Sequence, residues 1–438
     1  MAFIADKQTL EDLNLLGKFK PHSIYNLFNK VHTTGGERLL DAMFAQPLTD
    51  PEAINARSSI FQYFQQQAFT FPLPTSVFRT AENYLSMGTG TNFPAVFAAT
   101  FRKKAGAALV HDEQFAALKA GVVAALHILQ SLRRFADALR VPEGSAYSNE
   151  AASLKTLLAD RRLESVWGMG DHAALSFMQL VKYDLLLRHT LRDAVEKILE
   201  RVYHLDVYIA VSGVAKDRLF SYARALPKTQ HRVSTTALRH PALANAVANA
   251  LSLSAECNLL FLTGANMAGK STFMKSFGIA IYLAHMGFPV AAENMEFSVR
   301  DGLFSSINVP DNLSLGYSHF YAEVLRVKAV AQAVSEGKDL VVIFDELFKG
   351  TNVKDAYDAT LAVTAAFAAY RNCCFIISTH IIEVGEPLKQ QAAGVQFAFL
   401  PTVMDGPVPR YPYTLQAGIT NDRHGMMIIG NERILEMM

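Results

Sequence analysis

A short apolar run followed at once by a glycine-rich loop constrains the fold of this chain more than any other feature. Residues 259–262 are apolar, residues 264–271 match the pattern G-x-x-x-x-G-K-[ST], and a helical segment continues to Met286. A strand, a tight glycine turn and a helix in this order gather backbone N–H groups and a helix N-terminus around one point. The pattern predicts a phosphate-binding loop, and the flanking strand and helix disfavour a chance glycine-rich turn.

Each fixed residue type in this loop has a chemical reason. The glycines let the backbone turn its N–H groups toward phosphates. Lys270 is expected to reach the β- and γ-phosphates, and the Ser271 hydroxyl to bind Mg²⁺. The predicted nucleotide-binding residues are Gly264, Ala265, Asn266, Met267, Ala268, Gly269, Lys270, Ser271 and Thr272.

Two further apolar runs end in polar residues. Residues 340–344 lead into Asp345 and Glu346, and residues 374–377 are followed closely by His380. Parallel strands end at one edge of a sheet, where open sheets bind ligands. We expect Asp345 to hold Mg²⁺, Glu346 to orient or deprotonate the attacking water, and His380 to sense the γ-phosphate. Taken alone, the acidic pair would be a capping pair and His380 an ordinary loop histidine.

The periodicity of apolar residues changes along the chain. Residues 23–224 repeat apolar positions at intervals of three and four, as amphipathic helices do, with a break at residues 142–145. From residue 234 onward, short apolar runs alternate with helical stretches, which favours a mostly parallel sheet flanked by helices. The predicted fold is mixed, with an all-α domain over residues 1–232 and an α/β ATPase domain over residues 233–438.

Composition bears on the cellular compartment and the partners of the protein. Half of the 438 residues are hydrophobic and the net charge is +1, which neither indicates nor excludes a nucleic-acid partner. The three cysteines lack zinc-ligand spacing and are too few for a disulfide framework, and we interpret Cys373 and Cys374 as core residues. The start lacks a signal-peptide pattern, and the apolar runs are too short to cross a bilayer. We expect a cytoplasmic protein with no membrane partner.

Residues 263–272, T-G-A-N-M-A-G-K-S-T, resemble the T-G-P-N-M-G-G-K-S-T of the MutS family of DNA mismatch repair proteins, which are ABC-type ATPases. Four other motifs resemble that family in the same order: R-H-P at 239–241, D-x-L-x-x-x-x-S-H-F-x-x-E at 311–323, D-E-x-x-x-G-T at 345–351 and T-H at 379–380. Nearer the start, residues 33–40, 46–48 and 54–57 are similar to the beginning of the family's helical core, or lever, domain.

The resemblance implies a function and partners. It implies ATP and Mg²⁺ as cofactors, hydrolysis of ATP to ADP and phosphate, and a conformational change passed to the lever. It also implies a homodimer through the ATPase domain, in which Ser318 contacts the nucleotide of the opposite subunit, and a role in DNA repair or DNA-structure binding. The residues ahead of Thr33 are too few for the family's mismatch-recognition and connector domains, and the clamp is reduced or absent. We therefore expect any DNA binding to lack mismatch preference.

Several positions depart from the family pattern. Ala265 and Ala268 replace a proline and a glycine in the loop, His319 replaces a threonine, and Ala246 stands where the family has an aromatic residue against the adenine. The last change leaves the preference for adenine open. Basic groups that could contact DNA phosphates, although they more often form solvated helix faces, lie at 102–104, 133–134 and 161–162.

Two other functions stay open. One is a nucleotide-dependent dimeric scaffold that does not hydrolyse ATP, and the other is a P-loop phosphotransferase. Glu346, directly after the expected metal ligand Asp345, favours water as the nucleophile and argues against both.

Overall fold

The structure is a computed structural model that describes residues 2–18, 20–87, 92–110, 113–168, 175–307, 319–405, 408–420 and 437. Contacts divide the chain into two compact units. One unit, which we call the α/β unit, comprises Met1–Phe28, Met43–Ser58 and Val214–Met438. The other, which we call the helical unit, comprises Asn29–Ala42 and Ser59–Gly213.

This division differs from the two consecutive domains expected at residues 1–232 and 233–438. Segments from the first sixty residues belong to the α/β unit because their polar groups bond to it. The Asn55 side chain donates to the Ala225 carbonyl and accepts from the Ala225 N–H, both at 2.9 Å. Arg57 donates to the carbonyl of Met286 at 3.0 Å. A helical period in the sequence carries no information about which unit a helix joins.

The helical unit is built from the segments that the sequence pattern predicts to be helical. Helix α7 (Gln114–Ala138) matches the expected helix, and the chain turns at residues 142–145 before α8 (Ser148–Leu158). The other elements that lie wholly or in part in this unit are α3 (Thr34–Ala45), α4 (Pro51–Gln67), α5 (Thr75–Ser86), α6 (Phe93–Val110), η1 (Arg161–Leu163), α9 (Glu164–Trp167), α10 (Phe177–Leu185), a π-helical turn η2 (Leu186–Thr190) and α11 (Arg192–Asp217). The end of α3, the first half of α4 and the last turn of α11 belong to the α/β unit.

A buried polar network lies beside the π-helical turn of the helical unit. Asp184 accepts hydrogen bonds from Tyr84 Oη at 2.7 Å and from Arg188 Nε at 2.6 Å. Asp184 and Arg188 are 2% and 7% exposed, so their charges are paired inside the unit rather than solvated. The π-helical turn lies between α10 and α11, and Leu191, which follows it, has left helical geometry.

One helix of the helical unit is long and apolar enough to be compared with a membrane span. Within the described residues, α7 alone meets that test, and 56% of its most apolar window is buried inside the protein. Its buried residues include Val122, Leu129 and Leu132, as in a core helix.

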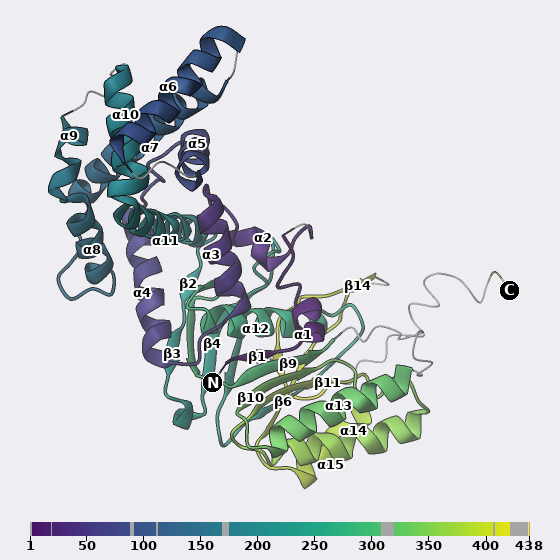
Figure 1. Ribbon diagram of the computed structural model, residues 1–438. Helices are drawn as coiled ribbons and strands as arrows, with labels where there is room; N and C mark the ends of the chain where they lie inside the picture. The colour runs from purple at the N-terminus through teal and green to yellow at the C-terminus, as the bar shows by residue number, and fades with distance from the viewer. Residues whose placement is uncertain are drawn as a thin grey trace. The chain divides into compact units, whose positions relative to one another are not determined.

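A seven-stranded sheet forms the centre of the α/β unit (Figure 1). Its order is β1-β9-β10-β11-β6-β12-β15, and all neighbouring pairs are parallel except β12 with β15. These strands are β1 (Ile4–Ala5), β6 (Leu259–Gly264), β9 (Gly302–Ser306), β10 (Leu340–Phe344), β11 (Cys374–Ser378), β12 (Val395–Leu400) and β15 (Gln416–Ala417). The three strands expected from the apolar runs, β6, β10 and β11, are confirmed and lie side by side.

Helices cover both faces of this sheet, which explains why its central strands read as unbroken apolar runs. Val342, Phe344 and Phe375 pack in one buried cluster with Val330 and Phe367. The latter two belong to α13 (His319–Ser335) and α14 (Val353–Ala368), which lie with α15 (Gly385–Gln391) beside the sheet in Figure 1. On the other face lies α12 (Lys270–His285), where a Cβ on Gly278 would come within 3.0 Å of Ile343.

Smaller elements complete the α/β unit. A four-stranded sheet has the order β3-β8-β4-β5, and two two-stranded sheets pair β2 with β7 and β13 with β14. The bounds are α1 (Lys7–Asp12), α2 (Ile24–Phe28), β2 (Ser221–Tyr222), β3 (Arg224–Leu226), η3 (Lys228–Gln230), β4 (Val233–Leu238), β5 (Asn249–Leu253), β7 (Pro289–Val290), β8 (Asn294–Ser298), η5 (Ile382–Val384), β13 (Val403–Asp405) and β14 (Val408–Arg410).

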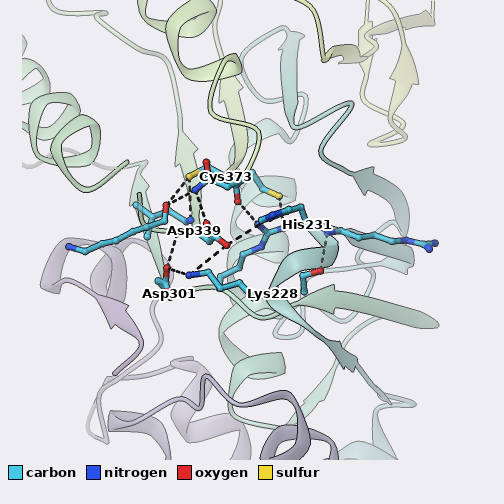
Figure 2. Close-up of polar contacts among 12 residues, drawn as sticks. Lys228, His231, Asp301, Asp339 and Cys373 are labelled. Carbon is cyan, nitrogen blue, oxygen red and sulfur yellow. Dashed lines mark hydrogen bonds and ion pairs between the residues drawn. The ribbon is translucent and has the colours of Figure 1, made fainter. Parts of the chain in front are cut away.

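The amino end of the large sheet carries a polar cluster, shown in Figure 2. Asp301, Asp339 and Cys373 directly precede β9, β10 and β11. Lys228 Nζ donates to Asp301 at 2.6 Å, and His231 lies 3.8 Å from Asp339. Each charge in this cluster has an internal partner, which stabilises the sheet end.

Both cysteines beside this cluster are buried, as the sequence interpretation expected. Burial raises the pKa of the Cys373 thiol to about 11 and also raises the pKa of Cys374. Cys374 Sγ accepts a hydrogen bond from the buried Arg300 side chain at 3.2 Å. Protonated, buried thiols are poor nucleophiles, so these residues act as core packing.

Candidate functional site

Three neighbouring parallel strands end around one cavity at the carboxyl edge of the large sheet. Strand β6 leads into the glycine-rich loop, β10 into Asp345, and β11 ends at Ser378. The order β10-β11-β6 brings segments together that lie far apart in the sequence. The expected convergence of the loop and the acidic pair is therefore seen in the structure.

The backbone of the glycine-rich loop shows which positions need special conformations. Positive φ angles occur at Gly264 (140°), Met267 (74°) and Gly269 (99°). Ala268 is buried and is not among the described residues with positive φ, so alanine in place of the family's glycine is accommodated there. Met267 bears the left-handed conformation instead, and its side chain is 78% exposed.

Lys270 begins α12 with its ammonium group held inside the loop. Its Nζ donates to the carbonyls of Gly264 at 2.7 Å and Ala265 at 3.2 Å. Burial lowers the pKa of Lys270, and the nearby carboxylates of Glu346 and Asp345 oppose that shift. The side chain therefore supplies a largely desolvated cation next to the N-terminus of a 16-residue helix, where anions are favoured.

The Asp345 carboxylate is fixed by two hydroxyl groups. Ser271 Oγ donates to its Oδ2 and Ser378 Oγ to its Oδ1, each at 2.5 Å. The Asp345 N–H donates to the Ser306 carbonyl at 2.9 Å, which ties the residue to β9. The two expected metal ligands, Ser271 and Asp345, therefore touch each other, and Ser378 is a positioning residue that the sequence analysis missed.

Glu346 follows in a left-handed conformation, with φ of 55°. Its N–H donates to the Ser378 carbonyl at 3.1 Å, which directs the chain away from the line of β10. In the part of the chain that the structure describes, its carboxylate makes no hydrogen bond to protein. The side chain lines the cavity and is half-buried, as a group that contacts water would be.

The cavity at this edge has a volume of about 650 Å³. Of the expected binding residues, it is lined by Ala265, Asn266, Met267, Gly269, Lys270, Ser271, Thr272, Asp345 and Glu346. Gly264 and Ala268 shape the loop from behind. The volume lies within the range of about 300–1,000 Å³ usual for small-molecule and cofactor sites.

Two residues that were not among the expected site residues also line the cavity. They are His240, whose pKa is lowered by burial and by nearby Lys275, and Tyr413, whose ring lies against Gly269. Ala246 also lines the cavity and offers no aromatic surface. His240 belongs to the R-H-P motif, so its position was available in the sequence, whereas Tyr413 had no local signal.

Two other expected site residues, His380 and Ser318, are not among the residues seen to line the cavity. His380 follows β11, but it is exposed and is not among the described residues that line the cavity. Ser318, expected to contact the nucleotide of a second subunit, lies outside the described residues. Asn352 caps α14 by accepting a hydrogen bond from the Asp355 N–H at 2.9 Å.

The residues present fit Mg²⁺ and a nucleoside triphosphate. A hydroxyl and a carboxylate are hard oxygen ligands, and Mg²⁺ is usually bound by one or two protein oxygens together with phosphates and water. Among the described residues, no three His, Cys, Asp or Glu side chains form a metal site of their own. The buried Lys270 ammonium supplies the cation that a phosphate requires.

Comparison with known protein families covers both units. The model of MutS domain III matches residues 8–212, and that of MutS domain V matches residues 242–434. The chain belongs to the MutS family. The domain V match contains the loop, the acidic pair and Tyr413, whereas Leu238 and His240, which also line the cavity, lie just ahead of it.

Two named relatives illustrate the likeness to MutS. The DNA mismatch repair protein MutS of Petrotoga mobilis is 28% identical over 255 residues, covering 56% of this chain and 30% of the relative. That of Anaplasma phagocytophilum is 32% identical over 189 residues, covering 42% of this chain and 22% of the relative. The matched part of this chain therefore spans less than a third of the length of either relative.

Proposed function

We propose that this protein is a Mg²⁺-dependent ATPase that hydrolyses ATP to ADP and phosphate at the carboxyl edge of the large sheet. The observation that carries the proposal is the junction of Lys270, Ser271 and Asp345. A desolvated cation lies in a phosphate-sized loop, and a hydroxyl–carboxylate pair suited to Mg²⁺ lies directly beside it. Bound Mg²⁺ would neutralise charge on the β- and γ-phosphates.

Different residues of the site have different roles. Backbone N–H groups of residues 264–269 and the Lys270 ammonium bind the phosphates, and Ser271 and Asp345 hold the metal. Glu346 orients and deprotonates the attacking water, since its carboxylate is free of protein hydrogen bonds among the described residues. His240 and Tyr413 border the space left for the nucleoside, and His380 remains a proposed γ-phosphate sensor that would have to turn inward.

The test separates binding from turnover. Glu346→Gln should bind ATP as the wild type does but lose about 10²- to 10⁴-fold in the rate of phosphate release, the usual contribution of a positioned general base. Release of inorganic phosphate identifies hydrolysis, whereas transfer of radiolabelled phosphate to another molecule would establish a phosphotransferase. Equal loss of ATP affinity and rate in Glu346→Gln would contradict the division of roles.

We also propose that ATP drives or tightens a homodimer through this edge. Met267, in the glycine-rich loop, and Val353, the first residue of α14, are 78% and 77% exposed, although both are apolar. Exposed apolar residues around a ligand site favour a covering partner. Sedimentation of Glu346→Gln with ATP should show a dimer, and Val353→Lys should weaken it. A monomer at all concentrations of protein and ATP would contradict the proposal.

We propose a role related to DNA mismatch repair, because both named relatives are DNA mismatch repair proteins. We propose that the α/β unit passes a nucleotide-dependent change to the helical unit, which would act as a lever. DNA binding should therefore respond to ATP. Titration of a matched duplex, a duplex with one G·T mismatch and a four-way junction, with and without ATP, would identify the preferred DNA. No binding to any of them would contradict a direct role on DNA.

A further inference from the structure

The outer edge of β9 is completed by side chains rather than by a strand. Strand β1 has two residues and pairs with Gly302 and Leu303, so it leaves the last part of β9 without a strand partner. The N–H groups of Ser305 and Ile307 point to this edge. They donate to Thr9 Oγ1 at 3.0 Å and to Asp12 Oδ2 at 2.9 Å.

Helix α1 supplies these acceptors, and Arg326 completes the arrangement. Asp12 Oδ2 also accepts from Ser305 Oγ at 2.8 Å. Arg326, from α13, donates to the Ser305 carbonyl at 2.6 Å and to Thr9 Oγ1 at 3.1 Å. Asp6 binds the Arg326 guanidinium and also caps α1 by accepting from the Thr9 N–H at 3.0 Å.

Burial makes these contacts obligatory. Thr9, Asp12 and Ser305 are 0%, 4% and 1% exposed, so water cannot replace a lost partner. Burial alone would raise the pKa of Asp6, but hydrogen bonds from Arg326 and Thr9 outweigh it and lower that pKa. Asp6 is therefore ionised at neutral pH and pairs with the Arg326 guanidinium.

The opposite edge of the same strand end faces the candidate metal site. Ser306 lies between Ser305 and Ile307, and its carbonyl accepts from the Asp345 N–H at 2.9 Å. Ile307 itself lines the cavity. One short backbone segment, residues 305–307, thus has α1 on one edge and Asp345 on the other.

We propose that Asp12 and Thr9 are positioning residues for the metal site, acting through residues 305–307 on Asp345. The proposal rests on the proposed Mg²⁺–nucleotide function. The segment at the start of the chain is then part of the machinery that sets metal affinity, although it is separated in sequence from every cavity residue. Outer-shell partners of metal ligands typically change metal affinity by about 10- to 100-fold when removed.

The experiment measures metal binding without turnover. Mn²⁺, in place of Mg²⁺, is titrated into protein saturated with ADP, and free Mn²⁺ is followed by electron paramagnetic resonance. Asp12→Ala should weaken Mn²⁺ binding by about tenfold or more. Asp12→Asn, which keeps an oxygen acceptor, should stay close to the wild type. Glu11→Gln, an exposed change on the same helix, is the matched control.

Two further measurements separate positioning from loss of structure. Binding of ADP in excess EDTA should be the same in Asp12→Ala as in the wild type, because Asp12 is not among the described residues that line the cavity. Thr9→Val preserves shape and removes a hydroxyl that accepts from the Ser305 N–H and from Arg326 and donates to Asp6. It leaves Asp12 in place, so it should weaken Mn²⁺ binding by a smaller factor, and it decides the question if Asp12→Ala does not fold. Unchanged Mn²⁺ affinity in these variants, or an equal loss of metal-free ADP binding, would overturn the proposal. A wild type that does not bind Mn²⁺–ADP would instead refute the proposed function.

Discussion

At the amino end of the large sheet two carboxylates have cationic partners within the protein, whereas at the carboxyl end the charged groups lie beside an open cavity. Asp301 and Asp339 have Lys228 and His231 as partners and also accept hydrogen bonds from backbone or amide groups. Lys270, at the other end, donates only to two backbone carbonyls among its hydrogen bonds. The same sheet thus uses charge for stability at one end and keeps charge available for a ligand at the other.

Lowering the pH should first destabilise the amino end of the sheet. His285, at the end of α12, is fully buried, and burial lowers its pKa from 6.5 to about 4. Its Nδ1 lies 2.8 Å from the Leu48 carbonyl, and its Nε2 accepts from the Arg300 N–H at 3.3 Å, an arrangement that requires the neutral ring. Arg300, which disfavours protonation, and Asp301, which favours it, are the charged groups facing the ring.

The sign of the pH effect follows from the lowered pKa. Above pH 6.5 both folded and unfolded states hold a neutral histidine, and below it the unfolded state binds a proton that the folded state does not. The free energy of unfolding should fall by about 1.4 kcal/mol per pH unit, or roughly 3 kcal/mol between pH 6.5 and 4. Urea unfolding across this range measures it. In His285→Gln the slope should decrease, and an unchanged slope would exclude His285 as its source.

Arg300→Met should destabilise the amino end without affecting the carboxyl end. Arg300 is 1% exposed and donates to the Asn372 carbonyl at 2.6 Å. Methionine fills a similar volume but leaves that carbonyl unpaired, which costs about 1–3 kcal/mol of unfolding free energy. Chemical denaturation measures the loss, and the dissociation constant for Mg²⁺–ATP should stay within about twofold of the wild type. A large change in nucleotide affinity would show that the two ends are coupled.

Ser378→Ala should affect metal binding at the carboxyl end more than the stability of the fold. Its hydroxyl donates to Asp345, and its removal leaves the carboxylate less firmly oriented. We expect about a tenfold loss in Mg²⁺ affinity, equivalent to about 1.4 kcal/mol, and a smaller change in stability. Ser335→Ala, at an exposed serine that donates to the Gln332 carbonyl, is the control. Equal metal affinity in both variants would remove Ser378 from the site.

Local patterns in the sequence were sufficient for the central strands, the glycine-rich loop and the acidic pair. Strands β6, β10 and β11 are buried on both faces, so they leave unbroken apolar runs, and the loop has fixed residue types. The contribution of residues 4–12 to the sheet could not be predicted, because β1 has two residues and its partners lie in β9. Ser378 and Tyr413 were missed for the same reason, since their importance comes from contacts distant in sequence.

Two lysines at opposite ends of one sheet provide the most direct test of the central claim, that the carboxyl edge alone binds the nucleotide. Lys228 lies at the amino end with an internal carboxylate partner, and Lys270 lies in the loop. Mg²⁺–ATP is titrated calorimetrically into the wild type, Lys228→Ala and Lys270→Ala. We predict equal affinity for the wild type and Lys228→Ala. For Lys270→Ala we predict a loss of affinity of about 100-fold or more, roughly 2.7 kcal/mol. Equal affinity of the two variants, or no binding by the wild type, would contradict it.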